Sequence, residues 1–162
     1  MSIEGLYAPA ILQLAREARD RAPVLCPTAR ATVLSNRFCG DEVRLEVRVE
    51  EGLIREIACS VHACVLCEVS ALIMRQAMIG KDDSSLPQAE QFLSDLAGGS
   101  PVTPPAGWEE LGKFEPLQRF KNRLECVLLP LRALRQALSD HTQTSASSSC
   151  NTDIGRTSSW PH

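Results

Sequence analysis

The sequence lacks a long apolar run, a basic stripe and a large surplus of charge of one sign. No stretch approaches the ~20 consecutive apolar residues that a helix needs to cross a bilayer, so we expect no contact with a membrane. Lysine and arginine total 17 against 20 acidic residues, and the two signs are interspersed along the chain. A nucleic-acid-binding protein would instead gather its basic residues into a patch, so we expect no nucleic-acid partner.

The sequence also shows no sign of export or of a disulfide framework. The start, MSIEGLYAPAILQLAREARDR, has no basic segment before its short apolar stretch, so we predict no secretion signal and a cytoplasmic location. The seven cysteines are an odd number, and thiols stay reduced in the cytoplasm, which argues against structural disulfides. The cysteines therefore favour a metal site or thiol chemistry, with some thiols buried or incidental.

Length and composition indicate one globular domain and a polar tail. The chain is 44% hydrophobic and 23% charged, and its 162 residues suffice to bury a core without disulfides. From Asp140 onward the sequence is polar and rich in Ser and Thr. We therefore predict one domain over residues 1–139 and a disordered tail over residues 140–162.

The strongest structural signal is an alternation of apolar and charged residues between residues 41 and 61. Every second position from Val43 to Val49 is apolar, and arginine or glutamate fills the places between. Strict alternation is typical of a strand with one buried face. The letters EEG then supply a turn in which Gly52 can take a positive φ, and the following residues place Cys59 on the apolar face. The pattern predicts an antiparallel hairpin over residues 41–61.

Helical spacing of apolar residues marks most of the remaining chain. A short strand is expected in ATVLS, residues 31–35, and a short helical piece with a turn over residues 108–120. Pro130 should kink or split the last helix, because it cannot donate to the preceding turn. Helices are predicted over residues 3–21, 64–79, 87–96 and 121–138.

Three cysteines stand at the ends of these elements. Cys39 comes just before the first hairpin strand and Cys64 just after the second, so the hairpin should make them neighbours. Gly40 allows a sharp turn that points Asp41 the same way as Cys39. Cys126 would complete the group if the last helix packs over that end of the sheet. The predicted result is a site of three thiolates and one carboxylate.

Such a donor set suits a tetrahedral metal site. Zinc takes cysteine sulfur and aspartate oxygen, and thiolates also hold iron–sulfur clusters. Oxygen is a harder ligand than sulfur and holds soft iron–sulfur units less tightly. One carboxylate among thiolates therefore fits a cluster that is built and passed on, although the residues alone leave zinc and iron–sulfur both open.

Two segments resemble a known family. FCGDEVRLEVRVEEGLIREIACSVHACVLCEVSA and the later RLECVLLPLRAL are similar to the IscU/SufU/NifU N-terminal family of iron–sulfur scaffold proteins. The resemblance implies an α+β fold, with a three-stranded antiparallel sheet and helices packed on one face. It also implies that Cys39, Asp41, Cys64 and Cys126 are the ligands. A cysteine desulfurase would supply sulfur as a persulfide, and acceptor proteins would receive the cluster.

The long stretch between Gly80 and Cys126 resembles the SufU branch, but several positions depart from the family pattern. Glu125 stands where the family has a histidine or a basic residue, and Cys67 where it has a small hydroxylic one. Next to the ligands, His62, Cys67 and Glu125 are candidates for supporting positions. We therefore interpret the chain as a divergent member.

Three functions are compatible with these residues. The first is a non-enzymatic scaffold that builds a labile cluster from iron and desulfurase-derived sulfur. The second is a zinc-dependent sulfurtransferase of the SufU type, in which Cys39 is the candidate persulfide acceptor. The third is a thiol–disulfide oxidoreductase that uses Cys64 and Cys67 as a CxxC pair. This third function leaves Cys39, Asp41 and Cys126 unexplained and lacks the βαβ setting of thioredoxin-like proteins.

Overall fold

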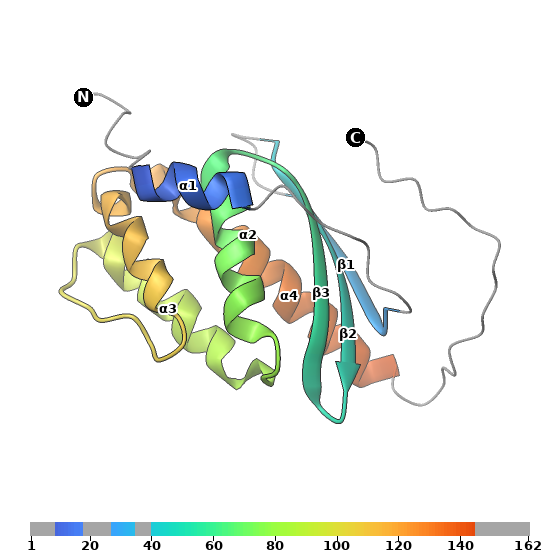
Figure 1. Ribbon diagram of the computed structural model, residues 1–162. Helices are drawn as coiled ribbons and strands as arrows, with labels where there is room; N and C mark the ends of the chain where they lie inside the picture. Colours follow the sequence, from blue (N-terminus) through green and yellow to red (C-terminus); the bar gives the residue numbers. More distant parts are fainter. Residues whose placement is uncertain (1–8, 18–26, 35–39, 145–162) are drawn as a thin grey trace.

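The computed structural model describes residues 9–17, 27–34 and 40–144 of the chain. A helix is followed by three consecutive strands, and helices alone follow from residue 65 onward (Figure 1). The elements are α1 (Pro9–Glu17), β1 (Ala29–Leu34), β2 (Glu42–Glu50), β3 (Leu53–His62), α2 (Val65–Met78), η2 (Asp83–Ser85), α3 (Leu86–Gly98), η3 (Glu109–Gln118), η4 (Lys121–Arg123) and α4 (Leu124–Thr144). The α+β class is confirmed.

The sheet is antiparallel, with the order β1-β2-β3. The predicted hairpin is confirmed as β2 and β3, whose register pairs Val47 with Ile57 and Leu45 with Cys59. A register shift between Arg48 and Val49 accommodates one extra residue in β3. The shift lets Ile54 and Ile57 both face the core although they are three residues apart, because a bulge reverses the alternation.

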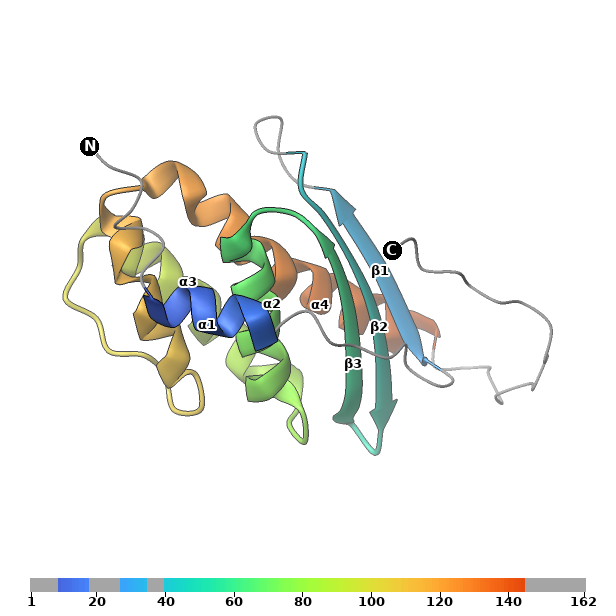
Figure 2. The same ribbon diagram turned by 45° about the horizontal axis from the view of Figure 1, so that its top comes forward.

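The helices gather on one side of the sheet (Figures 1 and 2). Helix α4 packs against β1 and β2, while α2 packs between β3, α4 and α1. The sheet face beneath them carries Val43, Leu45 and Val47, all buried, and this burial explains the apolar half of the alternation. Within the described residues, no helix is both long enough and apolar enough to span a membrane.

Helix α4 is continuous through Pro130, so the alternative that this proline splits the helix is wrong. Pro130 does remove one ladder hydrogen bond, but the helix is held by the buried leucines on either side of it, among them Leu128 and Leu134. Helix α4 also runs to Thr144, five residues past the predicted domain end. The tail beyond residue 144 and the predicted helix ends at residues 3–8 and 18–21 lie outside the described residues.

The turn between β2 and β3 stores local strain. Its two central residues, Glu51 and Gly52, both have positive φ, at 55° and 76°, as a type I′ hairpin turn requires. Glycine adopts this conformation freely, whereas glutamate has a Cβ that crowds the backbone there. The exposed Glu51 ion pair with Arg55, at 3.5 Å, offsets little of that cost.

We therefore predict that Glu51→Asn stabilises the protein, because asparagine tolerates the left-handed region. The expected gain in the free energy of unfolding is about 0.5 kcal/mol, measured as a higher urea midpoint. The control is Glu50→Asn. Glu50 precedes Glu51 and is also exposed, but it ends β2 and has an ordinary φ, so no gain in the free energy of unfolding is expected. A Glu51→Asn protein no more stable than the wild type would contradict the account.

Candidate metal centre

The hairpin register brings two of the predicted ligands to one end of the sheet. Glu42, the first residue of β2, pairs with His62, the last residue of β3. Asp41 immediately precedes β2, and Cys64 follows β3 as the N-cap residue of α2. Gly40 has a φ of 62°, a left-handed conformation that turns the chain sharply into Asp41. Asp41 and Cys64 are therefore held by the ends of regular elements.

The third donor comes from the last helix. Cys126 lies in the first turn of α4 and is completely buried. Packing of α4 against α2 brings it to the same end of the sheet, where both helices begin (Figures 1 and 2). A carboxylate oxygen of Asp41 and the Sγ atoms of Cys64 and Cys126 all lie within 4.8 Å of one another. That spacing allows a single ion, or the edge of a cluster, to contact all three atoms.

The electrostatics of the group favour a cation. Asp41 is 3% exposed, and its Oδ2 is buried with no hydrogen-bond partner. A buried carboxylate without partners costs several kcal/mol unless it is protonated or paired with positive charge. The Sγ atoms of Cys64 and Cys126 lie beside it and supply no positive charge that could pair with it. The donor set and the orphaned oxygen therefore fit zinc or an iron–sulfur cluster.

Cys39, the fourth predicted donor, lies outside the described residues. It precedes Gly40 directly in the chain, so its place among the ligands stays a prediction. Among the described residues, the group that could hold a metal ion thus consists of Asp41, Cys64 and Cys126.

Cys67 lies one turn into α2 and is completely buried. Its backbone N–H donates to the carbonyl of Cys64 at 2.9 Å, so the two residues share the first helical turn. Burial raises the pKa of the Cys67 thiol, and the nearby Cys64 and Asp41 raise it further. A thiol held in its protonated form is a poor nucleophile, which disfavours Cys64 and Cys67 as a thiol-exchange pair.

The two other candidate supporting residues lie at the surface. His62 is exposed at the end of β3 and is not part of the metal-ligating group. Glu125 precedes Cys126 but forms an ion pair with Arg132 further along α4. The structure therefore directs the Glu125 carboxylate along the helix surface.

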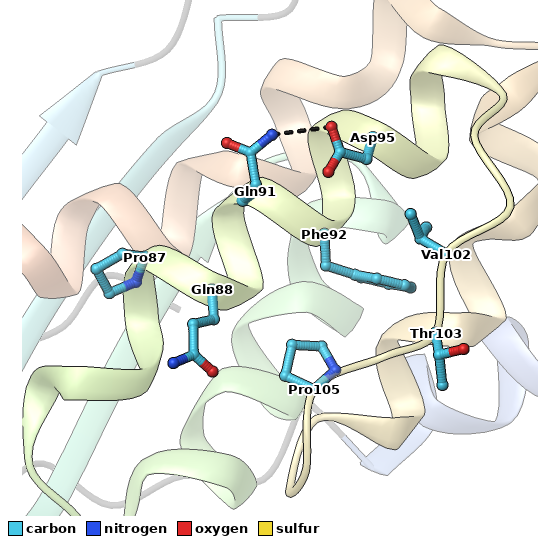
Figure 3. A pocket seen from close by; sticks show the side chains of 8 residues that line it. All are labelled: Pro87, Gln88, Gln91, Phe92, Asp95, Val102, Thr103 and Pro105. Atoms are coloured by element: carbon cyan, nitrogen blue, oxygen red, sulfur yellow. Dashed lines mark hydrogen bonds between the residues drawn. The ribbon is translucent and has the colours of Figure 1, made fainter.

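A shallow groove elsewhere on the molecule is not part of this site. It lies between α3 and the loop that follows it (Figure 3). Phe92, Val102 and Pro105 form an apolar lining, and the one carboxylate at its rim, Asp95, accepts a hydrogen bond from Gln91 at 2.8 Å. No described cysteine or histidine lines it, so the groove offers no metal donors of the kind found at Asp41.

Sequence reasoning missed the part played by Ser70. Its buried Oγ donates to the carbonyl of Val127 at 2.5 Å. The bond ties α2 to α4 beside Cys126. The signal in the sequence was a hydroxyl within an otherwise apolar stretch, VSALIM, where a buried polar group requires a partner.

Comparison with known proteins gives concordant results, although no family model matches the chain. The iron–sulfur cluster assembly scaffold protein IscU of Streptococcus pyogenes serotype M1 is 32% identical over 111 residues, which are 67% of this chain and 68% of that protein. The zinc-dependent sulfurtransferase SufU of Bacillus subtilis (strain 168) is 20% identical over 85% of this chain and 92% of that protein.

Solved structures show the same fold. The N-terminal part of a nitrogen-fixing NifU-like protein from Brucella abortus superposes with a TM-score of 0.79 at 25% identity, covering 88% of this chain and 98% of that one. The identity to the streptococcal protein, the shared fold and the ligating group at the hairpin end all agree. This chain belongs to the IscU/SufU/NifU family of iron–sulfur cluster assembly scaffold proteins.

Proposed function

We propose that this chain builds a labile iron–sulfur cluster on Cys39, Asp41, Cys64 and Cys126 and passes it to acceptor proteins. The observation that carries the proposal is the convergence of Asp41, Cys64 and Cys126 within 4.8 Å, with Asp41 Oδ2 buried and lacking a hydrogen-bond partner. The frame of the proposed scaffold is the sheet of β1, β2 and β3, with the helices against one face.

The thiolate and carboxylate donors have different roles in binding and releasing the cluster. Thiolates are soft ligands that bind iron–sulfur units strongly, so Cys64 and Cys126 anchor the cluster. The Asp41 oxygen is a harder donor and makes the fourth contact weak. Cys64 is half-buried while Cys126 is fully buried, so the cluster would be approached from the Cys64 side. A partner could then remove the cluster without opening the core.

Sulfur would reach the site from a cysteine desulfurase, with Cys39 as the candidate persulfide acceptor. Among the described cysteines, Cys59, Cys64, Cys67 and Cys126 form no disulfide, which suits a reducing compartment. We therefore propose a cytoplasmic setting, in which a desulfurase delivers sulfur and acceptor proteins take the finished cluster.

The alternative is a zinc-dependent sulfurtransferase, an enzyme rather than a scaffold. It is favoured by the similarity to the Bacillus subtilis sulfurtransferase over 92% of that protein. The same donors suit zinc, which would keep the bound thiols in the thiolate form. In this alternative Asp41, Cys64 and Cys126 order the site, and Cys39 accepts the persulfide sulfur.

Cys126→Ala should abolish cluster assembly. Anaerobic reconstitution with iron and sulfide is expected to give visible charge-transfer absorption in the wild type and none in this variant, because one anchoring sulfur is lost. The affinity for zinc should also fall by more than about 100-fold. Removing a residue that only supports a ligand can already lower metal affinity by about 100-fold, and Cys126 is itself a proposed ligand.

Cys59→Ala is the matched control for Cys126→Ala. Cys59 is also a buried thiol, but it faces the core opposite Leu45 and is not in the ligating group. Its replacement should leave both reconstitution and zinc binding intact. Equal losses in the two variants would show that a packing defect, rather than a lost ligand, explains the result.

Asp41→Ala should lengthen the lifetime of the assembled cluster several-fold, because the hard oxygen donor is removed while the sulfurs remain. The metal-free variant should be at least as stable as the wild type, since an unpartnered buried carboxylate disappears. The measurements are the decay of visible absorption and the thermal midpoint of metal-free protein.

The control for Asp41→Ala is Glu68→Ala. Glu68 also has a buried oxygen without a hydrogen-bond partner, but it is not in the ligating group. Its replacement should leave the lifetime of the cluster unchanged. A cluster that decays at the wild-type rate in Asp41→Ala would refute the lability argument.

Metal analysis of protein purified without chelators separates the two functions. For a scaffold we expect little zinc, or zinc that iron displaces during reconstitution, because the site must accept iron as cargo. One equivalent of zinc that resists exchange by iron would instead support the sulfurtransferase. Sulfur transfer from a desulfurase to Cys39, detected by mass spectrometry, would complete that case.

A further inference from the structure

Ser70 provides the one fully buried hydroxyl recorded among the described residues, in the middle of α2. Its Oγ donates to the backbone carbonyl of Val127 in α4 at 2.5 Å, across 57 residues of sequence. The neighbours of Ser70 in α2 are apolar and buried, including Val69, Ala71 and Leu72. A hydroxyl in such surroundings is tolerated only with a partner, so this bond fixes how the two helices meet.

The bond lies between the two helices that carry the cysteine ligands. Ser70 follows Cys64 by six residues in α2, and Val127 comes directly after Cys126 in α4. Any slide or rotation of α4 against α2 therefore changes the distance between the two Sγ atoms. Metal–sulfur bonds tolerate changes of only about 0.2 Å, so the site depends on this helix contact.

The first turns of α4 need such an external restraint because of Pro130. Proline has no backbone N–H, so it cannot donate to the carbonyl of Cys126 four residues earlier. Pro130 thus removes one backbone donor from the helical ladder in the turn that follows Cys126. The next carbonyl, that of Val127, is the one that Ser70 holds from outside the helix.

We propose that Ser70 is a positioning residue for the metal centre. Its hydroxyl holds α4 in register with α2, so that Cys126 Sγ and Cys64 Sγ stay at a distance that one metal ion can bridge. The proposal rests on the proposed function, in either the scaffold or the zinc form. An alanine would fill most of the same space, so the bond rather than the side-chain volume is the feature that matters.

The test is an anaerobic titration of the full-length protein with Co²⁺, whose visible spectrum reports the geometry and the sulfur ligands of the ion. Ser70→Ala is expected to weaken Co²⁺ binding by about tenfold, the equivalent of one hydrogen bond, and to shift the bands of the bound ion. Ser70→Thr keeps the hydroxyl and is expected to retain the wild-type bands.

Two controls separate positioning from stability. Ser139→Ala removes an exposed serine hydroxyl from α4, one that donates to the Arg135 carbonyl at 2.9 Å. This change should alter neither the affinity for Co²⁺ nor the bands of the bound ion. Leu93→Ala removes a fully buried side chain from α3 and should lower the thermal midpoint more than Ser70→Ala does. Its folded fraction should nevertheless show the wild-type Co²⁺ spectrum.

The outcomes distinguish this inference from the proposed function. A wild-type protein that fails to bind Co²⁺ would overturn the metal centre, and the role of Ser70 with it. Wild-type binding together with an unchanged Ser70→Ala spectrum and affinity would overturn the role of Ser70 alone. The same would follow if Ser70→Thr matched Ser70→Ala, or if Leu93→Ala shifted the bands as much, because the hydroxyl would then have no specific effect.

Discussion

The buried carboxylate of Asp41 is the constraint on which the rest of the site depends. Its Oδ2 has no hydrogen-bond partner, and the Sγ atoms of Cys64 and Cys126 lie within 4.8 Å of a carboxylate oxygen of Asp41. A protein core does not stabilise such a group by itself, because removing a carboxylate from water without a partner is costly. A bound cation or cluster converts this cost into a stabilising interaction, so ligand binding and the stability of this end of the fold are linked.

The fold holds the donors at the ends of one strand and two helices. Asp41 precedes a strand, Cys64 caps a helix, and Cys126 lies in the first turn of another helix. The register of β2 and β3 fixes the first two donors relative to each other, while the packing of α4 on α2 sets the third. The weakest of these restraints is the helix contact, since helices can slide more easily than hydrogen-bonded strands can.

Local patterns in the sequence predicted most of the frame. The hairpin follows from alternation with period two, and the proximity of Asp41 to Cys64 follows from the hairpin alone. Cys126 was predictable only on the condition that α4 packs over the sheet end, because no local pattern encodes a contact between helices so far apart in sequence. The continuity of α4 through Pro130 and the bond from Ser70 depend on the same packing, so the sequence left the first open and did not predict the second. The place of Cys39 among the ligands stays a prediction.

X-ray absorption spectroscopy at the zinc edge of the zinc-loaded wild-type protein identifies the atoms around the ion without relying on activity. We expect a four-coordinate shell with three sulfurs at about 2.3 Å and one oxygen at about 2.0–2.2 Å. A shell of nitrogen and oxygen alone, or a shell with a single sulfur, would contradict the convergence of Asp41, Cys64 and Cys126 on one ion.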